Sequence, residues 1–136
     1  MDYLLDTHIA IWAMYDDNKL NKLIKQIIEN PENNIFVSSI SVLDISIKNR
    51  KHPDLMPIDA NNFVCACKEN NFVLLPLKAN HIVSLDSLSY NENAPKHKDI
   101  LDKLLICQAK QENMMLLSHD HLIRYYKENC ILSIRK

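Results

Sequence analysis

Five short apolar runs alternate with longer stretches of helical spacing along this chain. The runs occupy residues 3–5, 35–37, 72–75, 114–117 and 131–134. Between the first two, apolar residues recur every three or four positions from Leu20 to Ile28 and form one face of a helix. Strands that are apolar on both sides need helices on both faces, and such strands normally lie in a parallel sheet. The alternation therefore predicts an α/β fold with a short, mainly parallel central sheet.

The other helical stretches are predicted at residues 41–50, 60–69, 79–88, 98–112 and 120–127. One obviously irregular segment, residues 89–96, precedes the most charged of these helices. The sequence has no internal repeat and no linker, and its 136 residues with 47% apolar side chains suffice for one core. We therefore predict a single domain that covers residues 1–136.

Composition excludes several classes of protein. No apolar run approaches the roughly 18 residues of a membrane span, and the first residues lack the basic leader of a signal peptide. The four cysteines form no CxxC pair and no Cys/His metal spacing, which favours a reduced, cytoplasmic protein. Because the chain has no glycine, a Walker loop, a GxGxxG motif and a GxSxG nucleophile elbow are all excluded. Asparagines such as Asn70 and Asn71 are expected at positive-φ turns and helix ends instead.

The net charge of −1 means that any contact with nucleic acid must use local positive charge. Two short basic runs are candidates, at residues 48–52 and 96–98. Runs of this kind are also common in solvated loops, so charge alone does not assign nucleic-acid binding to this chain.

Acidic residues follow several of the predicted strands. Asp6 ends the first apolar run, Asp120 follows the fourth, and Asp44 lies in the helix after the second. Asp99 and Asp102 are one helical turn apart before the fourth run. The carboxyl ends of parallel strands share one edge of a sheet, so these acids are expected to converge there. Clustered carboxylates repel one another unless a cation neutralises them, and Mg²⁺ or Mn²⁺ accepts such oxygen ligands and can activate water.

Each acid also has a purely structural alternative. Asp6 and Asp120 could cap the helices that follow them. Asp44 could close a capping box with Ser41 or pair with Lys48 at i,i+4 spacing. Taken singly, the acids in the helices are better explained this way, and only their joint placement favours a metal site.

Four segments, taken in order, resemble the VapC-like toxins of the PIN-domain family. They are YLLDTHIAIW, VSSISVLDISIK, HKDILDKLLICQAK and LLSHDHLIRYY, and together they span essentially the whole chain. The resemblance implies a three-layer α/β/α sandwich with a short parallel sheet, in agreement with the alternation described above. It also implies a metal-dependent endoribonuclease that acts on RNA, is silenced by a cognate antitoxin protein and forms a homodimer, without a role at membranes.

Position by position, the resemblance assigns roles to individual residues. It makes four residues catalytic acids: Asp6, Asp44, Asp102 and Asp120. Four residues become ligands of Mg²⁺ or Mn²⁺, namely Asp6, Asp99, Asp102 and Asp120. Ser118 and Thr7 are expected to support the site with their hydroxyl groups, and Lys48 and Lys103 to contact RNA phosphates.

One departure from the family pattern leaves a second function open. The second acid is usually Glu, and Asp44 is one methylene shorter. This favours, as an alternative, a weakly active or inert PIN module that serves as a binding or scaffold protein. A signalling receiver domain, another α/β protein with an acidic pocket, is disfavoured because its third strand should end in an acid, whereas residues 76–78 are Pro-Leu-Lys.

Overall fold

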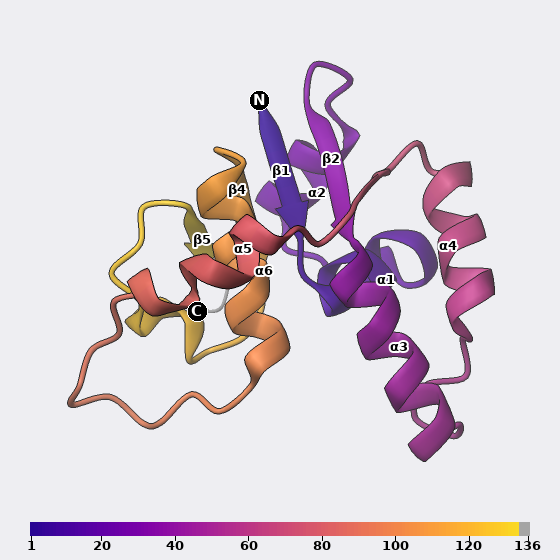
Figure 1. The fold of residues 1–136 in the computed structure, drawn as a ribbon. Coiled ribbons are helices and arrows are strands. Elements are labelled where there is room, and N and C mark those ends of the chain that lie inside the picture. The colour runs from indigo at the N-terminus through magenta and orange to yellow at the C-terminus, as the bar shows by residue number, and fades with distance from the viewer. Residues whose placement is uncertain (134–136) are drawn as a thin grey trace.

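The computed structural model describes residues 1–133 and contains a five-stranded, all-parallel sheet (Figure 1). Its strands are β1 (Asp2–Leu5), β2 (Asn34–Ser38), β3 (Val73–Leu75), β4 (Met115–Ser118) and β5 (Ile131–Ser133). They lie in the order β3-β2-β1-β4-β5. The five predicted strands and their parallel arrangement are confirmed, and position 134 of the last predicted run lies outside the described residues.

Helices occupy most of the predicted intervals. They are α1 (Thr7–Tyr15), α2 (Lys22–Glu29), α3 (Ser39–Lys51), α4 (Ala60–Glu69), α5 (Ala79–Val83) and α6 (Ile100–Gln111), with 3₁₀ turns η1 (Asp17–Lys19), η2 (Ser84–Ser87) and η3 (Ile123–Tyr125). The helix predicted over residues 120–127 is wrong, since only the η3 turn forms there. The chain becomes extended at Tyr126, whose ring is buried in the core, and a continued helix would not place it there.

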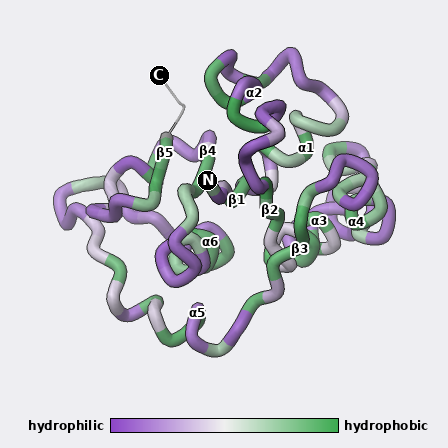
Figure 2. Tube along the Cα trace, turned by 90° about the horizontal axis from the view of Figure 1, so that it is seen from above, coloured by the Kyte–Doolittle hydropathy of each residue, from purple (hydrophilic) through white to green (hydrophobic). Residues whose placement is uncertain are grey.

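Two separate apolar cores cover the two faces of the sheet. Leu5 packs with α1, α2, α3 and α4, while the adjacent Leu4 packs with α6 and Tyr126. In Figure 2, α1 and α2 lie on one side of the sheet and α6 lies on the other. Neighbouring residues of one strand therefore enter opposite cores, which is why the strands read as continuous apolar runs. The predicted coverage of both faces is confirmed.

Asparagine takes positions that glycine often occupies. Asn71 and Asn113 have φ values of 61° and 56°, and both lie just after a helix, α4 and α6 respectively. A left-handed residue at this position closes the helix end, and asparagine tolerates it better than most residues. The expectation is confirmed for Asn71, which has a positive φ, and for Asn70, which lies at a helix end as the C-cap of α4 with a negative φ.

Strand β1 is the switch point of the sheet, because the chain adds strands first on one side of it and then on the other. From β1 the chain adds β2 and β3 on one side, then β4 and β5 on the other. In open α/β sheets, ligands bind at the carboxyl end of such a switch point. Asp6 follows β1 here, and its backbone N–H donates to the Leu117 carbonyl of β4 at 3.0 Å. Within residues 1–133, no helix has the length and apolar character needed to cross a membrane.

Candidate metal centre

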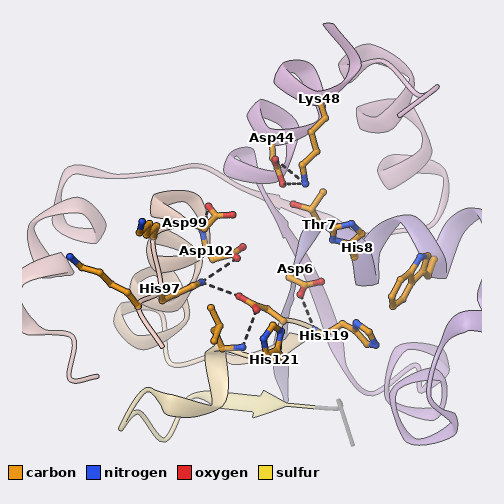
Figure 3. A pocket seen from close by; sticks show the side chains of 15 residues that line it. Asp6, Thr7, His8, Asp44, Lys48, His97, Asp99, Asp102, His119 and His121 are labelled. Carbon is orange, nitrogen blue, oxygen red and sulfur yellow. Dashed lines mark hydrogen bonds and ion pairs between the residues drawn. The ribbon is translucent and has the colours of Figure 1, made fainter. Parts of the chain in front are cut away.

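All five predicted acids line one cavity of about 630 Å³ at the carboxyl edge of the sheet (Figure 3). They are Asp6, Asp44, Asp99, Asp102 and Asp120. The acids come from the end of β1, from α3, from the start of α6 and from the segment after β4. Parallel topology thus brings together side chains that are more than a hundred positions apart in the sequence.

Asp6 is both buried and firmly held. As the N-cap of α1, it accepts a hydrogen bond from the Ile9 N–H on Oδ1 at 2.8 Å. Its Oδ2 accepts from the His119 N–H after β4 at 3.0 Å. Burial raises the pKa of Asp6, while the hydrogen bonds from Ile9, Ser118 and His119 act in the opposite direction. The capping alternative is therefore realised, in a residue that also faces the cavity.

Asp102 and Asp120 lie together with a histidine that the sequence analysis had not assigned to the site. The donor atoms of Asp102, Asp120 and His97 all lie within 4.8 Å of one another. The His97 Nε2 atom is 3.0 Å from Oδ2 of Asp120 and 3.6 Å from Oδ2 of Asp102. Within residues 1–133, this is the group of His, Cys, Asp and Glu side chains whose spacing fits a metal ion.

The two carboxyl groups of this cluster have opposite pKa shifts. Burial raises the pKa of Asp102 to about 8, and the negative charges of Asp99 and Asp120 act in the same direction. Burial also acts to raise the pKa of Asp120, but the Leu122 N–H, the Asp102 side chain and His97 together hold it below its usual value. Without a cation, the pair therefore retains a proton near neutral pH, as two close carboxyls do when both cannot ionise.

Asp99 caps the helix that carries Asp102. Its Oδ1 accepts from the N–H groups of Leu101 at 3.0 Å and Asp102 at 3.2 Å. Helix α6 therefore begins at Ile100, two residues later than the predicted start at residue 98. Asp99 lines the cavity but lies outside the 4.8 Å group, so its metal-ligand role stays a prediction.

Asp44 pairs with Lys48 on α3. The Lys48 Nζ atom lies 3.3 Å from each oxygen of the Asp44 carboxylate, and the pair projects from α3 at the cavity in Figure 3. The capping box that Asp44 could have formed with Ser41 is absent, because α3 starts at Ser39 and Ser38 caps it. Asp44 also lies outside the 4.8 Å group, so a direct role in metal binding stays a prediction.

The two predicted supporting hydroxyls hold backbone elements together. The Thr7 hydroxyl donates to the Ser41 hydroxyl at 3.0 Å, which ties α1 to α3. The Ser118 hydroxyl accepts from the Asp120 N–H at 3.1 Å, and its hydrogen bond lowers the pKa of Asp6. Thr7 lines the cavity, and buried Ser118 acts through Asp6 and Asp120.

Positive side chains are among the lining residues of the cavity. Lys48, Lys96 and Lys98 line it, whereas Lys103, which was predicted to contact RNA, is not among its lining residues. Lys96 and Lys98 come from the basic run at residues 96–98, in the irregular connection before α6. Local rather than overall positive charge thus surrounds the acids.

The donor set fits a divalent cation. Carboxylate oxygens are the ligands that Mg²⁺ and Mn²⁺ accept. The pKa of Asp102 is raised mainly by burial and further by the negative charges of Asp99 and Asp120. In addition, the buried Nε2 atom of His97 has no hydrogen-bond partner within residues 1–133. A divalent cation bound here would stabilise both the acidic cluster and the unsatisfied buried nitrogen.

Comparisons with known proteins agree with this class of fold. A sequence model of the PIN domain matches residues 3–129, and the chain therefore belongs to the PIN domain family. The comparison with curated proteins found no match.

Three solved structures with a similar fold are VapBC or toxin–antitoxin complexes. VapBC2 from Rickettsia felis, bound to a DNA fragment from its promoter, superposes with a TM-score of 0.65 at 14% identity, over 100% of this chain and 99% of that one. A toxin–antitoxin complex from Klebsiella pneumoniae gives 0.58 at 14% identity, over 96% of each chain. VapBC-1 from nontypeable Haemophilus influenzae gives 0.56 at 17% identity, over 88% and 87% of the two chains. At these identities the likeness shows the fold.

Proposed function

We propose that this chain is a metal-dependent endoribonuclease and the toxin of a toxin–antitoxin pair. The observation that carries the proposal is the convergence of five carboxylates on one cavity in a member of the PIN domain family. The raised pKa of Asp102 supports it, because burying repelling acids costs stability unless a ligand compensates. Mg²⁺ or Mn²⁺ is the proposed cofactor.

In this proposal the acids of the cavity bind the metal ion and its lysines bind the RNA backbone. Asp102 and Asp120 hold the cation, with Asp6 beside them on the rigid end of β1. A divalent cation supplies positive charge that activates water and stabilises the phosphodiester transition state. Lys96 and Lys98 bind the flanking phosphates of RNA and orient the backbone across the acids.

The proposed partners follow from the structural neighbours, which are toxin–antitoxin complexes. We infer that a cognate antitoxin protein binds this chain and that two copies associate in the cytoplasm.

A second candidate function is a binding module without nuclease activity. The Asp44–Lys48 pair favours it, because the lysine neutralises the acid at the position where the family usually has Glu.

Cleavage of RNA tests the proposed function directly. We expect the purified chain to cut single-stranded RNA with Mg²⁺ or Mn²⁺, to stop in EDTA, and to leave 5′-phosphate and 3′-hydroxyl ends. These ends follow if water attacks phosphorus and the 3′ oxygen leaves. Denaturing gels and end-labelling report both properties. Cleavage that persists in EDTA and leaves 2′,3′-cyclic phosphates would contradict the metal mechanism, and no cleavage under any metal would favour the binding module.

Substitutions at Asp44 test whether that acid contributes to metal binding. Losing one methylene shortens the reach of the carboxylate by about 1.5 Å relative to Glu. We expect Asp44→Glu to raise cleavage at limiting Mg²⁺, and Asp44→Asn to weaken Mn²⁺ binding by about ten-fold. Isothermal titration with Mn²⁺ measures the second effect.

The matched control for Asp44 is Asp17→Asn, which removes an acid paired with Lys25 at 3.1 Å outside the cavity lining. This control should leave both metal binding and cleavage unchanged. Superimposable Mn²⁺ titrations for the native chain, Asp44→Glu and Asp44→Asn would show that Asp44 serves only its pair with Lys48.

A further inference from the structure

His97 is a buried residue that points at two acids. Its side chain is only 4% exposed, and Nε2 lies 3.0 Å from Asp120 and 3.6 Å from Asp102 (Figure 3). Despite these short distances, Nε2 makes no hydrogen bond among residues 1–133. A buried polar nitrogen without a partner costs free energy, so its position calls for a ligand.

The opposite side of the imidazole is fixed by Tyr126. The His97 Nδ1 atom lies 2.7 Å from the Tyr126 hydroxyl, and the two rings meet edge to face with centroids 5.4 Å apart. The oxygen of the Tyr126 hydroxyl has lone pairs that can accept a hydrogen bond from Nδ1–H at this distance. Histidines that bind metals are commonly oriented in this way through their second ring nitrogen.

The spacing of the three donor atoms also suits a shared ion. Ligands at about 2.1 Å from one ion lie roughly 3–3.5 Å from each other at octahedral or tetrahedral angles. The two separations measured from Nε2, 3.0 and 3.6 Å, are close to this range. A hydrogen bond from His97 to Asp120 would explain the 3.0 Å distance. It would not explain why a second carboxylate, that of Asp102, lies 3.6 Å from the same nitrogen atom.

We propose that His97 binds the metal directly through Nε2, together with Asp102 and Asp120, and that this nitrogen ligand makes the site prefer Mn²⁺ to Mg²⁺. Mg²⁺ takes oxygen ligands and keeps its own waters, whereas first-row transition ions accept imidazole nitrogen. The inference rests on the proposed metal site but not on RNA cleavage. It specifies the ligand set and the ion of that site.

The first experiment uses the unaltered chain. Electron spin-echo spectroscopy of bound Mn²⁺ detects magnetic coupling to a directly ligated nitrogen, and this coupling changes when histidine carries the heavy nitrogen isotope. We expect a histidine-nitrogen coupling that responds to the isotope. A Mn²⁺ signal without such coupling overturns the proposal, whatever the chain does to RNA.

Substitution then identifies which histidine binds. His97→Gln retains an amide near the position of Nε2 but removes the imidazole nitrogen. We expect it to abolish the nitrogen coupling and to weaken Mn²⁺ binding by ten-fold or more, with less than about a three-fold change for Mg²⁺. His8→Gln and His121→Gln are matched controls, because both histidines line the same cavity, and they should keep the coupling. Loss of coupling in a control but not in His97→Gln would overturn the assignment.

A second pair of variants tests the orientation of the ring without removing it. Tyr126→Phe deletes the hydroxyl at Nδ1 and is expected to weaken Mn²⁺ binding by about ten-fold while the fold persists. Tyr125→Phe is the matched control, since the Tyr125 hydroxyl accepts a hydrogen bond from the exposed Arg124 at 3.1 Å. If His97 only donated a hydrogen bond to Asp120, the amide of His97→Gln would replace that bond. This variant would then bind Mn²⁺ as tightly as the native chain, and that result would also overturn the proposal. Cleavage of RNA without nitrogen coupling would leave the proposed function standing and reject this inference alone.

Discussion

Asp102→Asn is expected to lower RNA cleavage by about 10³-fold while making the metal-free protein more stable at alkaline pH. A bound cation contributes several kcal/mol to the transition state, and about 1.4 kcal/mol corresponds to a ten-fold change in rate. Asn cannot supply the charged oxygen of Asp102 at the centre of the cluster. The stability of the metal-free protein should change in the opposite direction, because the same substitution removes a half-buried acid beside Asp99 and Asp120.

The pH dependence of stability follows from the direction in which the pKa of Asp102 is shifted. The pKa of Asp102 is raised by burial to about 8, well above its ordinary value of 3.8. Between these two values the folded state binds a proton that the unfolded state has released, so the free energy of unfolding falls as pH rises. The stabilisation is complete below about pH 4 and is lost by about pH 8, and it amounts to a few kcal/mol.

Thermal unfolding in EDTA at about pH 5 and about pH 9 measures this effect. The native chain should lose stability across the interval, whereas Asp102→Asn should lose less and should exceed the native chain at the higher pH. Asp54→Asn, an exposed acid outside the cavity lining, is the control for a change of net charge. Parallel pH profiles for the native chain and Asp102→Asn would show that Asp102 is already ionised in the metal-free protein.

Much of the site could be predicted because strand ends are fixed by simple rules. The apolar runs define β1 and β4, and parallel topology places the residues that follow them at one edge of the sheet. Asp6 and Asp120 are therefore predictable from sequence alone. Asp102 is predictable less directly, since it depends on where α6 begins, and the Asp99 cap sets that point two residues later than predicted.

His97 could not be found in this way. It lies in the irregular connection before α6, where no periodicity indicates which way a side chain points. Its orientation depends on Tyr126, which is 29 positions later and turns into the core where the predicted helix fails to form. The signal available in the sequence was the histidine two residues before Asp99, in a segment that also reads as a basic loop.

Asp6→Ala is expected to destabilise the protein far more than the loss of an ordinary helix cap. Each oxygen of Asp6 accepts a backbone hydrogen bond, one from Ile9 in α1 and one from His119 after β4. Alanine leaves both N–H groups without this acceptor in a buried region, at a cost of about 1–3 kcal/mol each. A melting temperature lower by roughly 10 °C is expected for a domain of this size.

Asp6→Asn separates the cap from the charge. Asparagine keeps one acceptor oxygen but places an amide NH₂ near the other N–H, so it loses one hydrogen bond. It also removes a carboxylate whose pKa is raised by burial, and the two effects should nearly cancel in metal-free protein. Both substitutions should reduce cleavage strongly, but only Asp6→Ala should lower the melting temperature by the full amount.

The matched control for Asp6 is Asp59→Ala. Asp59 caps α4 with one hydrogen bond to the Asn62 N–H at 2.8 Å, and it is exposed. Losing this cap should cost about 1 kcal/mol. The difference between the two alanine variants, measured by denaturant unfolding in EDTA, gives the contribution of burial and of the link to His119. If both variants lose the same stability, Asp6 acts as an ordinary cap, and its bridge between β1 and β4 adds nothing to the rigidity of the metal centre.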